Sequence, residues 1–277
     1  MSEICLLCKE RKVYQIKSHL TPAGITENTY GERNKEVIYT IDPKNKNVDK
    51  YYGREYPQEE TTEIKDEPNA RRGIFCKVCE TDFGTYESAV QNKLNEFINS
   101  IGHTAGIKRT GFYIKYSNLD FHPNVLITFF LSIVWRQCIE QILDEMDNPI
   151  SEEELEKLRV LVLLKISTPI NEIIKQDVIQ SPKMSIFTTY DTKIQPTWAN
   201  PHPKETNPQI FFIGPIVLLY WVNQNVTDNF NNLTLIDKGL LDDNISLKTS
   251  RIGIIHPNQW TKISNKMAQN LVRDFMR

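Results

Sequence analysis

Two stretches of the chain, Cys5-Leu6-Leu7-Cys8 and Cys76-Lys77-Val78-Cys79, decide the expected fold of its N-terminal part. Each is a C-x-x-C pair, and two intervening residues let both sulfur atoms reach one ion at about 2.3 Å. Four thiolates complete the tetrahedral shell that Zn²⁺ prefers, and they leave no open position for catalysis. We therefore predict a structural Zn²⁺ bound by Cys5, Cys8, Cys76 and Cys79. Chance pairing or a redox motif is the alternative interpretation.

The composition is that of an ordinary globular protein, and the length of 277 residues predicts one or two domains. Lys and Arg number 33 against 35 Asp and Glu, which gives a formal net charge of −2. Hydrophobic residues make up 40% and charged residues 25% of the chain, which excludes a disordered, collagen-like or coiled-coil chain. The near-neutral charge also argues against attraction of nucleic acid by the charge of the whole molecule, because such binding needs an excess of Lys and Arg.

The sequence predicts no membrane segment and a cytoplasmic location. The N-terminus meets the charged residues Lys9 to Lys12 before any apolar run of signal-peptide length. The apolar runs Val125–Trp135 and Ile210–Val222 are shorter than the roughly 20 residues that cross a bilayer, so both are interpreted as buried core. A reducing compartment favours metal ligation over disulfides. Cys138, inside the first run, is interpreted as a core thiol.

The expected fold class is α+β, with two parts. Residues 1–90 form a small zinc-stabilised ββα module with a polar insertion at about 26–72, in which Val37-Ile38-Tyr39 indicates a short hairpin. Residues 91–277 form a mainly helical domain with a few C-terminal strands. Apolar periodicity and the Ser151/Glu154 capping box predict helices over 86–101, 123–146 and 151–165, a short helix to 176 and a final helix after 258 or 261. Strands are predicted at 111–116, 185–190 and 210–213.

The residues around the two cysteine pairs resemble the HNH, or ββα-metal, endonuclease superfamily with its treble-clef zinc fold. Ser18-His19-Leu20-Thr21-Pro22 follows the first pair, and Glu80 directly follows the second. The resemblance covers residues 1–90. A closer resemblance, to a group of poorly characterised bacterial HNH-like proteins, adds Leu131-Ser132-Ile133-Val134-Trp135-Arg136 and Leu158-Arg159 and extends to about residue 165.

The resemblance implies roles for particular residues. His19 corresponds to the general base that activates water, and Glu80 to a residue that binds a catalytic Mg²⁺ or Mn²⁺. Asn69 lies loosely at the position of the middle Asn of the motif. The chain departs from the family where Ser18 replaces an acidic or His ligand and where Glu80 replaces a His or Asn. Arg71, Arg72 and Lys77 flank the second pair and are candidate phosphate contacts, with solvated surface charge as the alternative.

The expected function is that of an HNH-like nuclease that hydrolyses DNA or RNA, as a bacterial defence or mobile-element effector. The alternative is a catalytically inactive zinc-stabilised interaction or nucleic-acid-binding protein that works with a partner, bound through the C-terminal domain. In that case His19 packs or caps a turn, and Glu80 is an acid favoured by the positive end of a helix. A transcription-linked DNA-binding protein is a third interpretation, disfavoured by the near-neutral charge.

Arg136 interrupts an apolar helical face next to Trp135. A buried arginine needs a partner, so we predict an ion pair with Glu87 or Glu140 that ties the zinc module to the helices. Trp135, Phe129 and Phe130 are predicted to be core residues.

Overall fold

A computed structural model describes residues 3–14, 17–22, 25, 37–42, 47–52, 70–101, 115–143, 150–180, 183–189, 209–213, 216–222 and 247–255. Its helices are α2 (Lys77–Ile101), α3 (Pro123–Leu143), α4 (Glu152–Ile166), α5 (Ile170–Ile173) and the 3₁₀ turn η2 (Leu247–Thr249). Its strands are β1 (Lys17–His19), β2 (Val37–Asp42), β3 (Asn47–Tyr52), β4 (Ala70–Arg72), β5 (Lys115–Asn118), β6 (Met184–Thr189), β7 (Gln209–Ile213), β8 (Ile216–Tyr220) and β9 (Arg251–Ile255). The predicted α+β class is confirmed.

Two small antiparallel pairs belong to the N-terminal part. Strand β1 pairs with β4 across the long insertion, and β2 pairs with β3 inside it. The predicted hairpin around Val37 is thus present as β2 and β3. Strand β4 leads within a few residues into α2, so β1, β4 and the start of α2 are neighbours in one unit that contains all four cysteine ligands.

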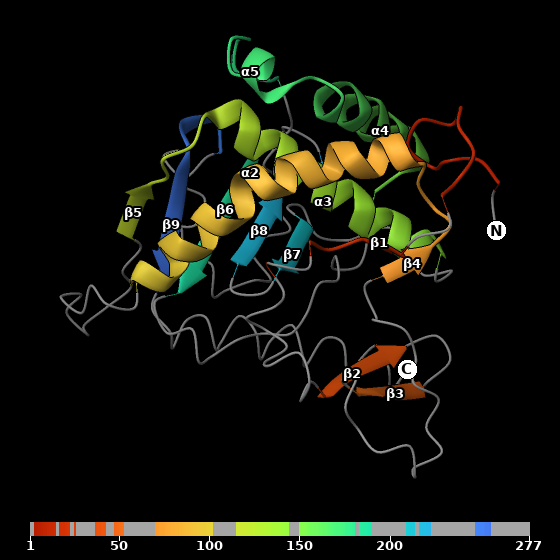
Figure 1. The fold of residues 1–277 in the computed structure, drawn as a ribbon. Coiled ribbons are helices and arrows are strands. Elements are labelled where there is room, and N and C mark those ends of the chain that lie inside the picture. Colours follow the sequence, from red (N-terminus) through yellow and green to blue (C-terminus); the bar gives the residue numbers. More distant parts are fainter. Residues whose placement is uncertain are drawn as a thin grey trace.

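A five-stranded mixed sheet forms the other side of the molecule, in the order β5-β9-β6-β8-β7. Strands β6 and β9 are parallel, and the remaining pairs are antiparallel. Every residue of β6 and β8 is buried, as expected for central strands. Helices α2 and α3 lie between this sheet and α4 (Figure 1). Only a few C-terminal strands were expected in residues 91–277, but this part of the chain contributes a sheet of five strands.

Helix α3 is the centre of the hydrophobic core. Its mean hydropathy and its 21 residues are sufficient for a membrane span, but 89% of that window is buried inside the protein. Trp135, Phe129 and Phe130 are fully buried, which confirms their assignment to the core. Cys138 is also fully buried, and desolvation raises the pKa of its thiol. A helix that is apolar on all sides is typical of such a central position.

The predicted helices are present with shifted bounds. The helix expected to begin at Tyr86 begins at Lys77, inside the second cysteine pair. Ser151 caps α4, since its hydroxyl accepts a hydrogen bond from the Glu154 amide at 3.3 Å. The strand predicted at 111–116 is found at Lys115–Asn118, and the predicted final helix lies outside the described residues. Helix α2 runs through residue 90, so the division of the chain at that position remains a prediction.

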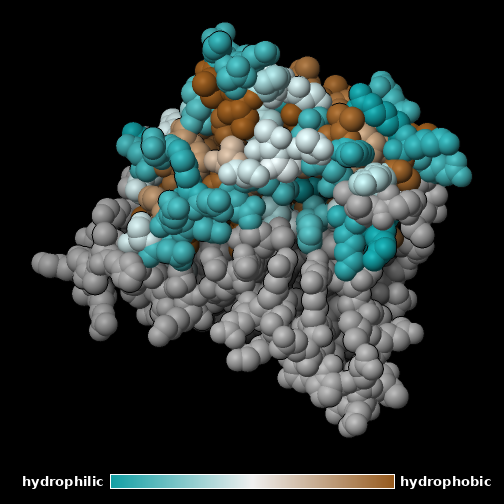
Figure 2. Space-filling view, viewed as in Figure 1, coloured by the Kyte–Doolittle hydropathy of each residue, from teal (hydrophilic) through white to brown (hydrophobic). Residues whose placement is uncertain are grey.

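The outer surface of α4 and α5 mixes charged and apolar residues, as Figure 2 shows. Val160 and Leu164 on α4 are 50% and 60% exposed, and Ile174 after α5 is 41% exposed. Glu153 and Lys157 share the outer face of α4 and form an ion pair of 2.9 Å. These apolar side chains are scattered among charges rather than gathered into one continuous patch.

Candidate metal centre and neighbouring polar cluster

The four cysteines predicted to bind zinc form one cluster. Each offers a sulfur atom, and the four atoms lie within 4.8 Å of one another, with every residue buried. The Cys8 and Cys76 sulfurs are 3.9 Å apart. Sulfur ligands placed tetrahedrally at about 2.3 Å from Zn²⁺ are about 3.8 Å from each other. The donor set and its spacing therefore fit a structural Zn²⁺, and the predicted grouping of the cysteines is confirmed.

Backbone hydrogen bonds hold the two cysteine pairs together. Lys9 adopts a left-handed conformation (φ 56°), which turns the chain so that its amide donates to the Cys5 carbonyl at 2.9 Å. The Leu6 amide donates to the Ile74 carbonyl at 3.0 Å and joins the first pair to the second. The Cys79 amide points at the Cys76 sulfur at 3.5 Å, where α2 begins. The cluster is thus preorganised by short loops and one helix N-terminus.

Cations surround the sulfur cluster. A hydrogen bond with Cys79 lowers the pKa of Cys5 to about 4. The pKa of Arg11 is raised, first by its hydrogen bond with Cys76. Arg159 of α4 donates to the Leu7 carbonyl inside the first pair. Four thiolates around Zn²⁺ leave a net charge of about −2, which these two arginines offset. Neither Arg11 nor Arg159 was predicted to contact the cluster. For Arg159 the reason is that only the fold brings residue 159 to residue 7.

Helix α4 is fixed through Glu156 to the N-terminal unit that carries the cysteine cluster. The Glu156 carboxylate accepts from Lys9 at 2.8 Å and from Arg159 at 2.7 Å. The hydrogen bond with Arg159, followed by that with Lys9, lowers the pKa of Glu156 to about 2. Because the side chain of Glu156 is 46% exposed, solvent screens this interaction strongly.

Replacing Glu156 with glutamine is expected to lower the free energy of unfolding by up to about 1 kcal/mol at neutral pH. A carboxyl group whose folded pKa is lowered stabilises the protein above its unfolded pKa of 4.5 and loses this effect as the pH falls through about 2. Urea unfolding should thus show a constant difference between wild type and Glu156→Gln from about pH 7 to about pH 5. Glu96→Gln, an exposed acid on α2, is the control. A difference that already shrinks over this range would contradict the assignment.

The register of β1 and β4 places Ser18 and His19 on opposite faces of this strand pair. Ser18 is opposite Arg71, His19 is opposite Ala70, and Lys17 is opposite Arg72. Neighbouring residues of a strand point to opposite faces, and directly paired residues share a face. Ser18 is accordingly buried, whereas Lys17 and His19 are half-buried. The face toward α2 carries Ser18, and the other face carries His19.

Glu80 lies in the first turn of α2 and faces Ser18. Burial raises the pKa of its carboxyl group, while the nearby Ser18 hydroxyl and the more distant charge of Arg136 act in the opposite direction. The two side chains are adjacent, but their geometry is not that of a hydrogen bond. Glu80 Oε1 and Ser18 Oγ are both buried without a hydrogen-bond partner among the described residues. A buried carboxylate oxygen in this state is costly unless a cation or donor binds it.

The other candidate residues are distributed around this cluster. Arg71 shares the Ser18 face, Arg72 is exposed on the opposite face, and Lys77 is exposed at the first turn of α2. Asp82, which was not among the predicted site residues, follows Glu80 by two residues on α2 and faces away from it, because residues two apart on a helix do not share a face. Its carboxylate accepts from the Ser167 hydroxyl at 3.5 Å instead. Asn69 lies outside the described residues.

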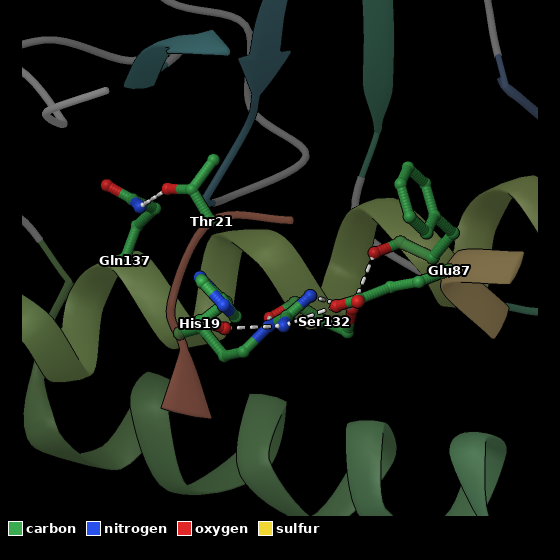
Figure 3. A network of polar contacts seen from close by, with 7 residues as sticks. His19, Thr21, Glu87, Ser132 and Gln137 are labelled. Atoms are coloured by element: carbon green, nitrogen blue, oxygen red, sulfur yellow. Dashed lines mark hydrogen bonds and ion pairs between the residues drawn. The ribbon is translucent and has the colours of Figure 1, made fainter. Parts of the chain in front are cut away.

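Arg136 is the centre of a polar network that includes His19, Glu87 and Ser132, which Figure 3 labels. Its Nη1 donates to Glu87 Oε1 at 2.6 Å and to the His19 carbonyl at 2.8 Å. Its guanidinium also lies 4.6 Å from the centre of the Phe83 ring. The side chain is only 2% exposed. The predicted ion pair with Glu87 is confirmed, and it joins β1, α2 and α3.

A second buried contact fixes the turn after His19. The Gln137 side-chain amide donates to the Thr21 hydroxyl, both residues being about 1% exposed (Figure 3). Two consecutive residues of α3, Arg136 and Gln137, therefore hold the end of β1 and the turn that follows it. Sequence analysis did not predict the second of these contacts.

No protein-family model matches the chain, and no significant match was found among curated proteins or solved structures. The geometry of the cysteine cluster and of the residues beside it is therefore what indicates a function.

Proposed function

We propose that this protein is a zinc-stabilised, metal-dependent nuclease of the HNH-like type, which hydrolyses phosphodiester bonds of DNA or RNA. The observation that carries the proposal is the buried Glu80 Oε1, which has no hydrogen-bond partner among the described residues and lies beside Ser18. These two oxygen donors adjoin His19 on the unit that the cysteine cluster holds together.

The donor set suits a hard divalent cation. Mg²⁺ and Mn²⁺ bind through one or two carboxylates plus waters, and a serine hydroxyl adds a weak neutral ligand. Glu80 would hold the ion with Ser18 beside it, and the ion would supply charge neutralisation at the phosphate. This role explains why a carboxylate oxygen is kept in a position that is shielded from water.

His19 is suited to act as the general base. A neutral imidazole has one ring nitrogen that can accept a proton from water. Because Ser18 and His19 lie on opposite faces of β1, one phosphate would contact both the ion beside Ser18 and the His19 imidazole only around the end of the strand, where β1 ends at His19. Arg136 holds the His19 carbonyl and so restrains the backbone that carries the base.

A second candidate is a catalytically inactive protein that uses the same module to bind nucleic acid or a protein partner. The specific observation in its favour is Ser18, which stands where the family has an acidic or His ligand and which binds Mg²⁺ weakly. The two candidates differ in one measurable property, the hydrolysis of a phosphodiester bond.

Cleavage of plasmid DNA and of RNA in the presence of Mg²⁺ or Mn²⁺ tests the proposal. His19→Ala is expected to reduce the cleavage rate by roughly 10²-fold or more, the usual contribution of general acid–base catalysis. Glu80→Gln is also expected to reduce the rate, because it removes the carboxylate that would hold the ion. Glu96→Gln, an exposed glutamate on the same helix, should cleave like the wild type. Zinc content and circular dichroism of each variant report whether it is folded.

Two outcomes would contradict the proposal. Equal cleavage by wild type and a folded His19→Ala variant removes His19 from the mechanism. Absence of cleavage by the wild type with either ion and either substrate favours the inactive binding protein.

A further inference from the structure

We propose that Arg159 of α4 is a positioning residue of the cysteine cluster, which strengthens metal binding from outside the shell of sulfur atoms. Arg159 restrains the backbone of the first cysteine pair and keeps positive charge beside the thiolates. Leu158-Arg159, a pair that extends the sequence resemblance beyond the N-terminal module, thereby gains a physical role. Metal binding by the cysteines is a property separate from the proposed hydrolysis, so the two can be tested apart.

The first observation is the contact of Arg159 with the loop of the first cysteine pair. Its Nη1 donates to the carbonyl oxygen of Leu7, and Leu7 is fully buried. This carbonyl belongs to the peptide bond that joins Leu7 to Cys8, so the hydrogen bond restrains the backbone that carries the Cys8 sulfur. Groups that are hydrogen-bonded behind metal ligands typically orient those ligands and tune the metal.

The second observation is how the guanidinium of Arg159 is held. Its Nε donates to Glu156 Oε2 at 2.8 Å, and its Nη2 donates to Glu156 Oε1 at 2.7 Å. Such a bidentate pair fixes the orientation of the planar group, and Nη1 contacts the Leu7 carbonyl. Glu156 also accepts from Lys9, which directly follows Cys8. Helix α4 therefore contacts the first cysteine pair on both sides of Cys8.

The third observation is the charge beside the cluster. Arg159, Glu156 and Lys9 form one connected group with two positive charges and one negative charge, so positive charge remains next to the thiolates. The pKa of Arg159 is raised first by its hydrogen bond with Glu156, and the charges of Cys8 and Cys5 act in the same direction. A cation in this place offsets the negative charge that four thiolates leave around a divalent metal.

Burial distinguishes Arg159 from Arg11, the other arginine near the cluster. The side chain of Arg159 is only 13% exposed, whereas Arg11 is exposed at the surface. Water and salt screen a partly buried charge much less than an exposed one. Arg159 is therefore expected to contribute more to metal binding than Arg11.

Zinc affinity tests this role directly. The full-length protein is titrated with Zn²⁺ at neutral pH in competition with a chromophoric chelator. Arg159→Met is expected to bind Zn²⁺ about 10- to 100-fold more weakly, the usual cost of losing a residue that supports a metal ligand. Arg159→Lys keeps the charge but lacks the planar fork that binds Glu156 and Leu7 together, so its affinity should lie between those of the wild type and Arg159→Met.

Cobalt substitution separates an effect on the sulfur atoms from a general loss of stability. Co²⁺ bound by thiolates absorbs light by transfer of an electron from sulfur to the metal. Positive charge near the sulfur atoms makes this transfer harder, so its removal in Arg159→Met should move the absorption band to longer wavelength. Arg159→Lys should keep the wild-type band. A residue that only stabilises the fold would leave the band of the loaded protein unchanged.

Two variants serve as matched controls. Tyr86→Phe removes the hydroxyl that contacts the Lys165 and Thr168 carbonyls, at 3.0 and 2.7 Å, at the C-terminal end of α4. Lys157→Met removes an exposed lysine from the same helix. Both variants should keep the wild-type cobalt band and bind Zn²⁺ far more tightly than Arg159→Met.

The role of Arg159 is disproved if the wild type binds neither metal, if folded Arg159→Met binds Zn²⁺ as tightly as the wild type, or if its cobalt band does not move. Weaker binding together with a shifted band in Arg159→Met, but not in the two controls, supports it. If Arg159→Met fails to fold, weaker zinc binding by Arg159→Lys supports the role and wild-type binding disproves it. None of these measurements involves nucleic acid, so they decide the role whether or not the protein cleaves DNA or RNA.

Discussion

Replacing Cys76 with serine is expected to abolish stoichiometric zinc binding and to unfold the N-terminal module. Cys76 contributes one of four buried sulfur atoms that lie within 4.8 Å of one another. In zinc-finger peptides the metal contributes on the order of 10 kcal/mol to folding at neutral pH. This is comparable with the whole stability of about 5–15 kcal/mol of a typical domain, so the remaining contacts of the module should not suffice.

Metal analysis and thermal unfolding measure this effect. The wild type should contain one zinc per chain and lose its cooperative transition when a strong chelator removes the metal, because metal binding and folding are coupled. Cys138→Ala is the control, since Cys138 is a fully buried core thiol on α3 outside the cluster. One zinc per chain retained by Cys76→Ser would disprove the four-cysteine assignment.

Replacing Arg136 with methionine is expected to destabilise the protein by about 3–5 kcal/mol, the usual cost of removing one partner of a buried ion pair. The Glu87 carboxylate and the His19 carbonyl both lose a short hydrogen bond to the same nitrogen. Methionine fills a similar volume, so the loss of charge and hydrogen bonds outweighs the loss of packing. The contact of the guanidinium with Phe83 is lost as well.

A double-mutant cycle in urea isolates the ion pair from the other contacts of Arg136. Glu87→Gln and Arg136→Met are measured singly and together, and the double variant should be more stable than the sum of the two losses predicts, by about 0.5–3 kcal/mol. Arg159→Met is the control, because Arg159 is paired with Glu156 rather than with Glu87. Strict additivity would show that Arg136 and Glu87 do not interact energetically.

Features that depend on short-range spacing could be predicted from the sequence. The two C-x-x-C pairs indicated the cysteine cluster, and the Ser151/Glu154 pattern indicated the start of α4. A single arginine in the apolar run around Trp135 indicated a buried ion pair, and the structure identifies Glu87 as its partner. A helix cap acts within a few residues of the chain. A ligand shell and a buried charge each restrict the possible partners to a few residues.

Features that depend on distant pairing could not be predicted. The five-stranded sheet joins Tyr116 to Gly253 and Ile186 to Ile252, and no local pattern encodes such a register. The contact of Arg159 with the Leu7 carbonyl has the same cause. The start of α2 was placed too late because the apolar periodicity was counted only from Tyr86 onward, whereas the helix already begins at Lys77 and also buries Cys79 and Phe83.

The pairing of His19 with Ala70 affects how insertions and deletions between these two residues change the stability of the protein. Because His19 and Ala70 are paired, the segment between them starts and ends at one point, which the β1–β4 pair and the four sulfur atoms fix. The entropic cost of closing a loop grows only with the logarithm of its length, so doubling this segment would cost about 0.6 kcal/mol. The length of the segment is therefore nearly uncoupled from the stability of the centre. Insertions between the described parts of this segment are therefore expected to leave the cysteine cluster and the β1–β4 pair in place.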